Sequence, residues 1–199
     1  MLKKIEVLEL CKKIALDYDG WEFVAGAFKD KRHKHTIKMV NPCWSFSPGS
    51  ALAQPIAAVS NKRIDKTFTE LFLSKAYWTH FVDLKFSYEG YIAGYRIYDL
   101  ISDDAEVRIR RMLNEGIELL DNTYDFSSED ALLKSIPFEI EQGPAVKNCI
   151  IQGCLGNYDF IKQYYNEEIE TEYPKKLDRV KKVMEYFNTE KRKKDRLKK

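Results

Sequence analysis

The pattern of apolar positions changes near residue 64 of this 199-residue chain. Between Trp21 and Ile64 the apolar residues form short extended runs separated by turns, and beyond Ile64 they recur at helical spacing. A strand-forming N-terminal part followed by a helical C-terminal part predicts an α+β fold. We therefore expect an N-terminal helix, a small antiparallel sheet of about three or four strands within residues 21–64, and a mostly α-helical C-terminal portion.

Turn residues divide the extended region into short predicted strands. Residues 33–40 alternate between two faces, which is typical of a half-buried strand, and Asn41-Pro42 marks the turn that follows. The connections are short enough for hairpins, so the strands should pair antiparallel. The predicted strands cover residues 21–28, 33–40, 43–47 and 55–64.

Helical spacing predicts a first helix over residues 2–17 and, after the sheet, a helix from about Lys66 to Leu84 that contains His80. Residues 85–100 are ambiguous, because tyrosines at helical spacing are interrupted by Gly90 and Gly94. Capping residues and prolines predict the remaining helices. These should begin near residues 103, 127, 144, 157 and 174.

The predicted organisation is one domain over residues 1–188, followed by a basic tail. The sheet-containing part should cover residues 1–64 and the helical part residues 65–188. Residues 189–199 contain almost nothing apolar to bury, so the tail is expected to fray.

Charge is unevenly distributed, although the net charge is only +2. Residues 1–98 contain 15 Lys and Arg against 10 Asp and Glu, residues 99–173 contain 6 against 17, and residues 174–199 contain 12 against 4. Segregation of this size creates a field that selects which partners approach.

The acidic segment leads to the main functional hypothesis, a non-enzymatic module that binds a basic partner protein through an acidic helical surface within residues 99–173. Many tyrosines, which are favoured at recognition surfaces, support this interpretation. A toxin-neutralising immunity protein of a bacterial-type cytosol is one concrete form, by analogy with inhibitors that use acidic faces. A solvated helix face is the competing interpretation. The candidate partner-binding residues are Asp103, Asp104, Glu115, Glu118, Asp121 and Asp125.

The basic C-terminal end leads to an alternative hypothesis, in which the last helix and tail bind nucleic acid by neutralising phosphates. No recognisable nucleic-acid-binding motif accompanies this segment, and the preceding acidic segment would repel the same polyanion. Intramolecular pairing with the acidic helices is the competing interpretation. The candidate residues are Lys191, Arg192, Lys193, Lys194 and Arg196.

A second alternative is an enzyme with a site near His33, His35 and Cys43, since two histidines at i and i+2 share one face of a strand. The same residues could bind zinc, but the surrounding lysines and arginine would repel a divalent cation, so a solvated basic strand is favoured. The sequence contains no glycine-rich phosphate-binding loop and predicts no cofactor.

The start of the chain has charged residues where a signal peptide would have an apolar core, and no segment has the length of apolar sequence that a membrane span needs. The protein is therefore expected in the cytoplasm. The four cysteines are too scattered for a disulfide framework and are expected to be small buried thiols.

Overall fold

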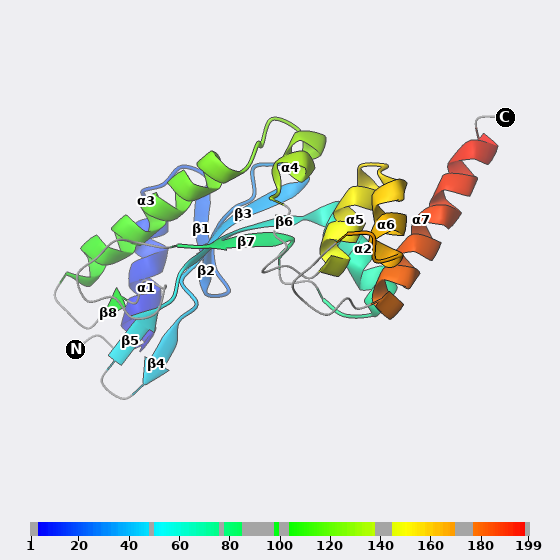
Figure 1. Ribbon diagram of the computed structural model, residues 1–199. Coiled ribbons are helices and arrows are strands. Elements are labelled where there is room, and N and C mark those ends of the chain that lie inside the picture. Colours follow the sequence, from blue (N-terminus) through cyan, green and yellow to red (C-terminus); the bar gives the residue numbers. More distant parts are fainter. Residues whose placement is uncertain are drawn as a thin grey trace. The chain divides into compact units, whose positions relative to one another are not determined.

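The computed structural model of the protein is shown in Figure 1. Contacts along the chain divide it into two compact units, and each unit is built from two separate segments. Unit 1 consists of residues 1–60 and 80–126, and unit 2 of residues 61–79 and 127–199. The structure describes residues 4–47, 50–75, 78–84, 98–99, 104–137, 145–169 and 177–197.

The described residues of unit 1 form two helices and most of the strands, so the predicted α+β fold class is confirmed. Its helices are α1 (Lys4–Ala15) and α3 (Ala105–Thr123). Its strands are β1 (Trp21–Val24), β2 (Ala27–Asp30), β3 (Thr36–Asn41), β4 (Ser45–Ser47), β5 (Ser50–Ala53), β6 (Ile56–Asn61), β7 (His80–Asp83) and β8 (Tyr98–Asp99).

The larger sheet has five strands in the order β1-β2-β3-β6-β7, and β4, β5 and β8 form a second sheet. The predicted strand over residues 21–28 is in fact a hairpin. Ala25 and Gly26 have positive φ values of 52° and 80°, which suits a tight turn between strands that twist to the right. Phe23 and Phe28 therefore face each other across β1 and β2, with ring centroids 4.9 Å apart.

Two helices cover one face of the five-stranded sheet, because α1 contacts β1, α3 contacts β3, and α1 and α3 contact each other. Val40 on β3 is fully buried beneath α3. Gly116 lets the helix approach closely, since a Cβ there would lie 2.7 Å from both Cγ atoms of Val40. Burial of this apolar layer is the main stabilising contribution in unit 1.

The buried carboxylate of Asp30, at the end of β2, binds Arg32, which links it to the turn before β1. Asp30 is 1% exposed and accepts hydrogen bonds from the backbone N, Nε and Nη2 of Arg32, at 2.9, 3.0 and 2.8 Å. Arg32 Nη1 also donates to Asp19 at 2.7 Å. Burial alone would raise the pKa of Asp30, but the hydrogen bonds and charge of Arg32 outweigh it, so the pKa lies below its ordinary value.

The predicted helix from Lys66 to Leu84 is wrong in its second half. Helix α2 (Lys62–Phe72) ends at Leu73, whose φ of 50° lies in the left-handed region. The chain then returns as β7, which pairs antiparallel with β6. His80 therefore lies on a strand rather than inside a helix. Of the ambiguous residues 85–100, only Tyr98 and Asp99 belong to the described part of the chain.

Unit 2 is helical in its described residues. It contains α2 and the helices α4 (Glu129–Ser135), α5 (Ala145–Cys154), α6 (Tyr158–Tyr165) and α7 (Leu177–Leu197). Helix α5 contacts α2, α6 and α7 and carries the buried residues Val146, Cys149 and Ile150. Helix α2 is capped by Asn61, whose Oδ1 accepts hydrogen bonds from the backbone N of Arg63 and Ile64.

The two units do not divide at residue 64, because β7 and α3 return to the sheet of unit 1 after α2 has contributed to unit 2. Helix α7 continues through Leu197. Fraying of the basic tail after residue 188 stays a prediction. Good helix formers dominate this end of the chain, which explains why it stays helical without an apolar face.

Candidate functional site

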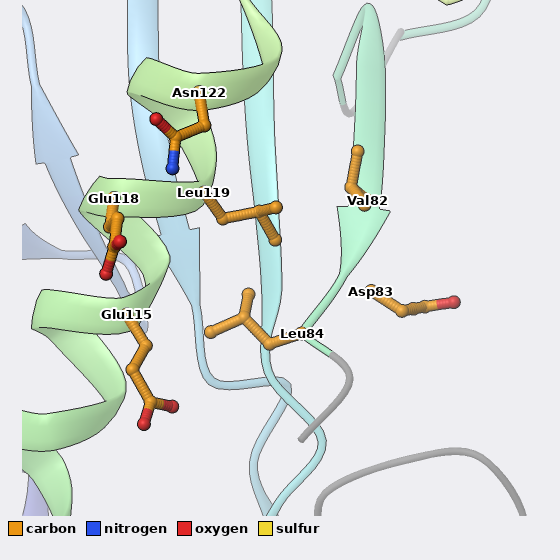
Figure 2. Close-up of a pocket in the computed structure, with 7 residues that line it drawn as sticks. All are labelled: Val82, Asp83, Leu84, Glu115, Glu118, Leu119 and Asn122. Atoms are coloured by element: carbon orange, nitrogen blue, oxygen red, sulfur yellow. The ribbon is translucent and has the colours of Figure 1, made fainter. Parts of the chain in front are cut away.

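A groove in unit 1 lies between the C-terminal half of α3 and strand β7, with a volume of about 430 Å³. In Figure 2, Leu84 and Leu119 point toward each other across the groove, whereas the Asp83 side chain points away from α3. Residues alternate between the two faces of a strand, which explains why Val82 and Leu84 line the groove with their side chains and Asp83 does not. The groove is lined by Val82, Asp83, Leu84, Glu115, Glu118, Leu119 and Asn122.

The floor of the groove is apolar and its helical rim is polar. Leu84 is 2% exposed, and Val82 and Leu119 are half-buried. Glu115, Glu118 and Asn122 follow one another at intervals of three and four residues, so they form one stripe on successive turns of α3. Acidic and amide groups thus stand directly beside exposed apolar surface.

The two carboxylates of the rim differ in their surroundings. Glu115 Oε1 accepts a hydrogen bond from Arg111 Nε at 2.8 Å, one helical turn before it. Glu118 is exposed and forms no ion pair with any residue that the structure describes. Glu118 therefore remains available to a cationic group that enters the groove.

Charge is polarised along α3 itself. Its first half carries Glu106 and three arginines, whereas its second half carries Glu115, Glu118 and Asp121 without any basic residue. Across the helix as a whole the acidic excess is only one, with four acidic residues against three arginines. The negative potential expected for the whole helix is thus confined to the half that borders the groove.

The predicted partner-binding residues have different positions in the fold. Asp103 lies outside the described residues. Asp104 lies at the start of α3 and pairs with Arg108 at 2.8 Å, and Asp121 pairs with Lys38 of β3 at 2.7 Å. Asp125 follows the helix and is exposed.

The structure brings only Glu115 and Glu118 of that set together in the groove. Asp104 is 17 positions from Asp121, a rise of about 26 Å along the helix, so those two carboxylates cannot share a small ligand. Furthermore, the predicted acidic surface over residues 99–173 divides between unit 1 and unit 2 at residue 126.

Sequence reasoning missed Val82 and Leu84, the apolar residues that make the groove. The signal that could have found them is the short alternation Val82-Asp83-Leu84, which lies within a segment that we interpreted as helical.

The alternative site near His33, His35 and Cys43 is not assembled by the fold. His33 packs on Phe126, with ring centroids 5.3 Å apart, and His35 is exposed before the start of β3. Cys43 lies beyond the other end of β3, eight positions from His35, or roughly 25 Å along an extended chain. Burial, together with the nearby charge of Asp83, raises the pKa of Cys43 and so disfavours its thiolate.

A second cleft, of about 450 Å³, lies in unit 2 between α2, α5, α6 and α7. Its polar groups are engaged with one another. Tyr186 Oη donates to Glu70 at 3.3 Å, Lys66 Nζ lies 3.8 Å from Glu70, and Arg63 Nη2 donates to the carbonyl oxygen of Cys154 at 3.0 Å. These contacts hold α2 against α5 and α7 rather than presenting free groups to a ligand.

The residues of the nucleic-acid alternative all lie on the last turns of α7, within unit 2. Lys191 is exposed, with its Nζ 5.4 Å from the ring centroid of Tyr158. The remaining four residues, Arg192, Lys193, Lys194 and Arg196, follow on the same helix.

No protein-family model, curated protein or solved structure matches the chain. Among the described residues, no three His, Cys, Asp or Glu side chains are arranged to hold a metal ion. None of the helices in the described part of the chain is long and apolar enough to cross a membrane.

Proposed function

We propose that the protein is a non-enzymatic interaction module that binds a basic partner protein in the groove between α3 and β7. The observation that supports this most directly is the position of Glu118, an exposed carboxylate beside the half-buried Leu119 and above the buried Leu84. A groove of this kind is complementary to a segment that presents a lysine or arginine next to an apolar side chain.

The two parts of the groove contribute to binding in different ways. The carboxylates of Glu115 and Glu118 attract a cationic segment, which raises the association rate and disfavours acidic partners. The apolar floor stabilises the bound state, because each apolar group that leaves water on binding contributes about 25 cal/mol per Å². Charge therefore selects the partner and apolar contact retains it.

The other carboxylates of α3 have roles within the fold. Asp104 and Asp121 are held by Arg108 and Lys38, and Glu106 by Arg110 at 2.8 Å. The proposed surface is thus narrower than the one that the sequence predicts. An immunity-type inhibitor that covers a basic cleft of a toxin is one concrete form of this function, by analogy only.

Synthetic peptides test the proposal directly. Four sets of about 12 residues would combine basic or acidic charge with apolar or polar character, and their affinity for the whole protein would be measured by fluorescence anisotropy. We expect the basic apolar set to bind most tightly and to weaken as salt rises. Equal affinity for acidic and basic sets would overturn the proposal.

A pair of double variants assigns the binding to the groove. E115Q/E118Q removes both rim carboxylates and should weaken the basic apolar peptides about tenfold. E6Q/E9Q removes two exposed carboxylates from α1 in the same unit and should leave the affinity unchanged. If both double variants weakened binding equally, the long-range charge of the unit, and not the groove, would be responsible.

A further inference from the structure

The C-terminal half of α7 carries a basic surface that no part of the proposed partner-binding groove uses. Val180, Val183 and Phe187 form the buried stripe of this helix, and Phe187 is the last of them. Beyond it the helix continues for ten residues to Leu197, about 15 Å, without another apolar residue before Leu197 itself. In Figure 1 this red end of α7 extends past α5 and α6.

The charge of this segment is strongly positive. Residues 188–197 contain five Lys and Arg and only two acidic residues, Glu190 and Asp195. Cations near a helix C-terminus stabilise the helix dipole, so one or two of them have a purely structural explanation. Five cations are more than the stabilisation of the helix dipole at the last turn explains.

The angular distribution of these residues points to the shape of the ligand. At about 100° per residue, taking Lys191 as zero, Arg192, Lys193, Lys194 and Arg196 lie at about 100°, 200°, 300° and 140°. Their backbone positions therefore surround the helix instead of forming one stripe. A flat acidic surface, whether a membrane or a protein, would meet only one side of such a helix and leave the other cations unused.

We infer that the C-terminal half of α7 binds double-stranded DNA by entering the major groove. The groove is about 12 Å wide, which matches the diameter of a helix with its side chains, and phosphates flank it on both sides. Cationic positions distributed around the helix are then within the reach of long side chains to phosphates on either side of the groove. The major groove of an RNA duplex is too deep and narrow for a helix to enter in this way. Because these contacts are to phosphates, binding is independent of base sequence.

The salt dependence of binding gives the first test. Five phosphate contacts predict a slope of about −4.5 for log K against log[salt], so affinity for a duplex of about 20 base pairs should fall about 500-fold between about 50 and 200 mM salt. The variant R192Q/K193Q/K194Q retains two of these cations, and its affinity should fall only about 12-fold over the same range. Fluorescence anisotropy of a labelled duplex with the full chain measures both.

A matched variant controls for overall charge. K162Q/K181Q/K182Q removes three exposed lysines from the body of unit 2 and should keep the full salt slope. An equal reduction of slope in both triple variants would overturn the assignment to the end of α7. The double variant E115Q/E118Q should bind DNA as the natural chain does, so failure of this inference is distinguishable from failure of the proposed function.

A proline tests whether the helix itself is required. Thr189→Pro keeps all five cations but removes the backbone N–H of residue 189 and breaks the helix before them. We expect a loss of affinity at least tenfold at about 50 mM salt, whereas Thr189→Ala should bind normally. If Thr189→Pro bound as tightly as the natural chain, the cations would bind DNA without a helix, and insertion of a helix into the major groove would be overturned. Tighter binding to single-stranded DNA, to an RNA duplex or to anionic phospholipid vesicles would also overturn it.

Discussion

Replacing Gly116 by alanine should destabilise unit 1, although alanine is the better helix former. The added Cβ would lie 2.7 Å from both Cγ atoms of Val40, well inside contact distance, and neither residue can move freely because Val40 is fully buried. Overpacking of this kind costs about 1–3 kcal/mol, whereas the gain in helix propensity is about 1 kcal/mol. The expected net loss is up to about 2 kcal/mol.

Urea unfolding followed by tryptophan fluorescence measures this loss. Trp21 and Trp44 report on unit 1, so the measurement uses a Trp78→Phe background to remove the signal of unit 2. Asn114→Ala is the matched control, because it gains helix propensity at an exposed position of the same helix without meeting the sheet.

A double-mutant cycle separates steric conflict from other effects. Val40→Ala removes both methyl groups that the new Cβ would meet, and alone it should cost about 2–3 kcal/mol through the cavity it leaves. In the V40A/G116A chain the two side chains no longer collide, so the total loss should be smaller than the sum by about 1–2 kcal/mol. Additive losses, or a Gly116→Ala variant as stable as Asn114→Ala, would refute the close approach of α3 to β3.

Three further predictions concern other parts of the chain. The pKa of Asp30 is lowered in the folded state, so its contribution to stability is present above about pH 4 and is lost as pH falls through the folded pKa. In urea unfolding, the natural chain should therefore be more stable than Asp30→Asn above about pH 4, and this difference should shrink below that pH. Burial raises the pKa of Cys11 and Cys149 to about 12, so iodoacetamide at neutral pH should alkylate them, as read by mass spectrometry, only after unfolding. Asn61→Ala removes the N-cap of α2 and should lower the unfolding free energy of unit 2 by about 2 kcal/mol in urea.

Local signals predicted the elements that depend on local chemistry. The cap of α6 is the predicted one, since Asn157 accepts a hydrogen bond from the backbone N of Phe160. Helix α4 is capped by Ser128, which accepts from the backbone N of Ala131, one position after the predicted start at Ser127. The first helix, and strands within the predicted ranges 33–40 and 55–64, also lie close to where the apolar pattern places them, whereas the predicted strand over residues 21–28 is a hairpin. These features depend on residues within a few positions of one another.

Strand β7 was missed because its determinants are distant in sequence. Leu73 ends α2 in a left-handed conformation that leucine seldom adopts, so no residue type marks that boundary. The strand then forms by pairing Val59 with His80 and Ile56 with Asp83, contacts that join two predicted elements across about 20 residues or more. Periodicity over a short apolar run cannot distinguish such a strand from a helix.

The carboxylates of the candidate site could be predicted from the sequence, but its apolar residues could not, because they depend on the strand that was missed. Spacing alone places Glu115 and Glu118 on one side of a helix, and the structure agrees. Their apolar neighbours are Val82 of β7 and Leu84, which directly follows that strand, so the groove could not be recognised until β7 was in place. What the sequence suggested as an extended acidic surface is a short rim beside an apolar floor.

The polarity of α3 gives a reason to look for function at this rim. Carboxylates are unfavourable near the C-terminal end of a helix, where the dipole is negative, and the last turn of α3 has no basic residue to offset Asp121. The fold supplies one from elsewhere, since Lys38 reaches Asp121 from β3. Glu118 receives no such partner among the described residues, and it borders the groove between α3 and β7. An exposed carboxylate beside the half-buried Leu119 is what a basic and partly apolar ligand would contact, and this is our reason for placing the proposed binding at the rim.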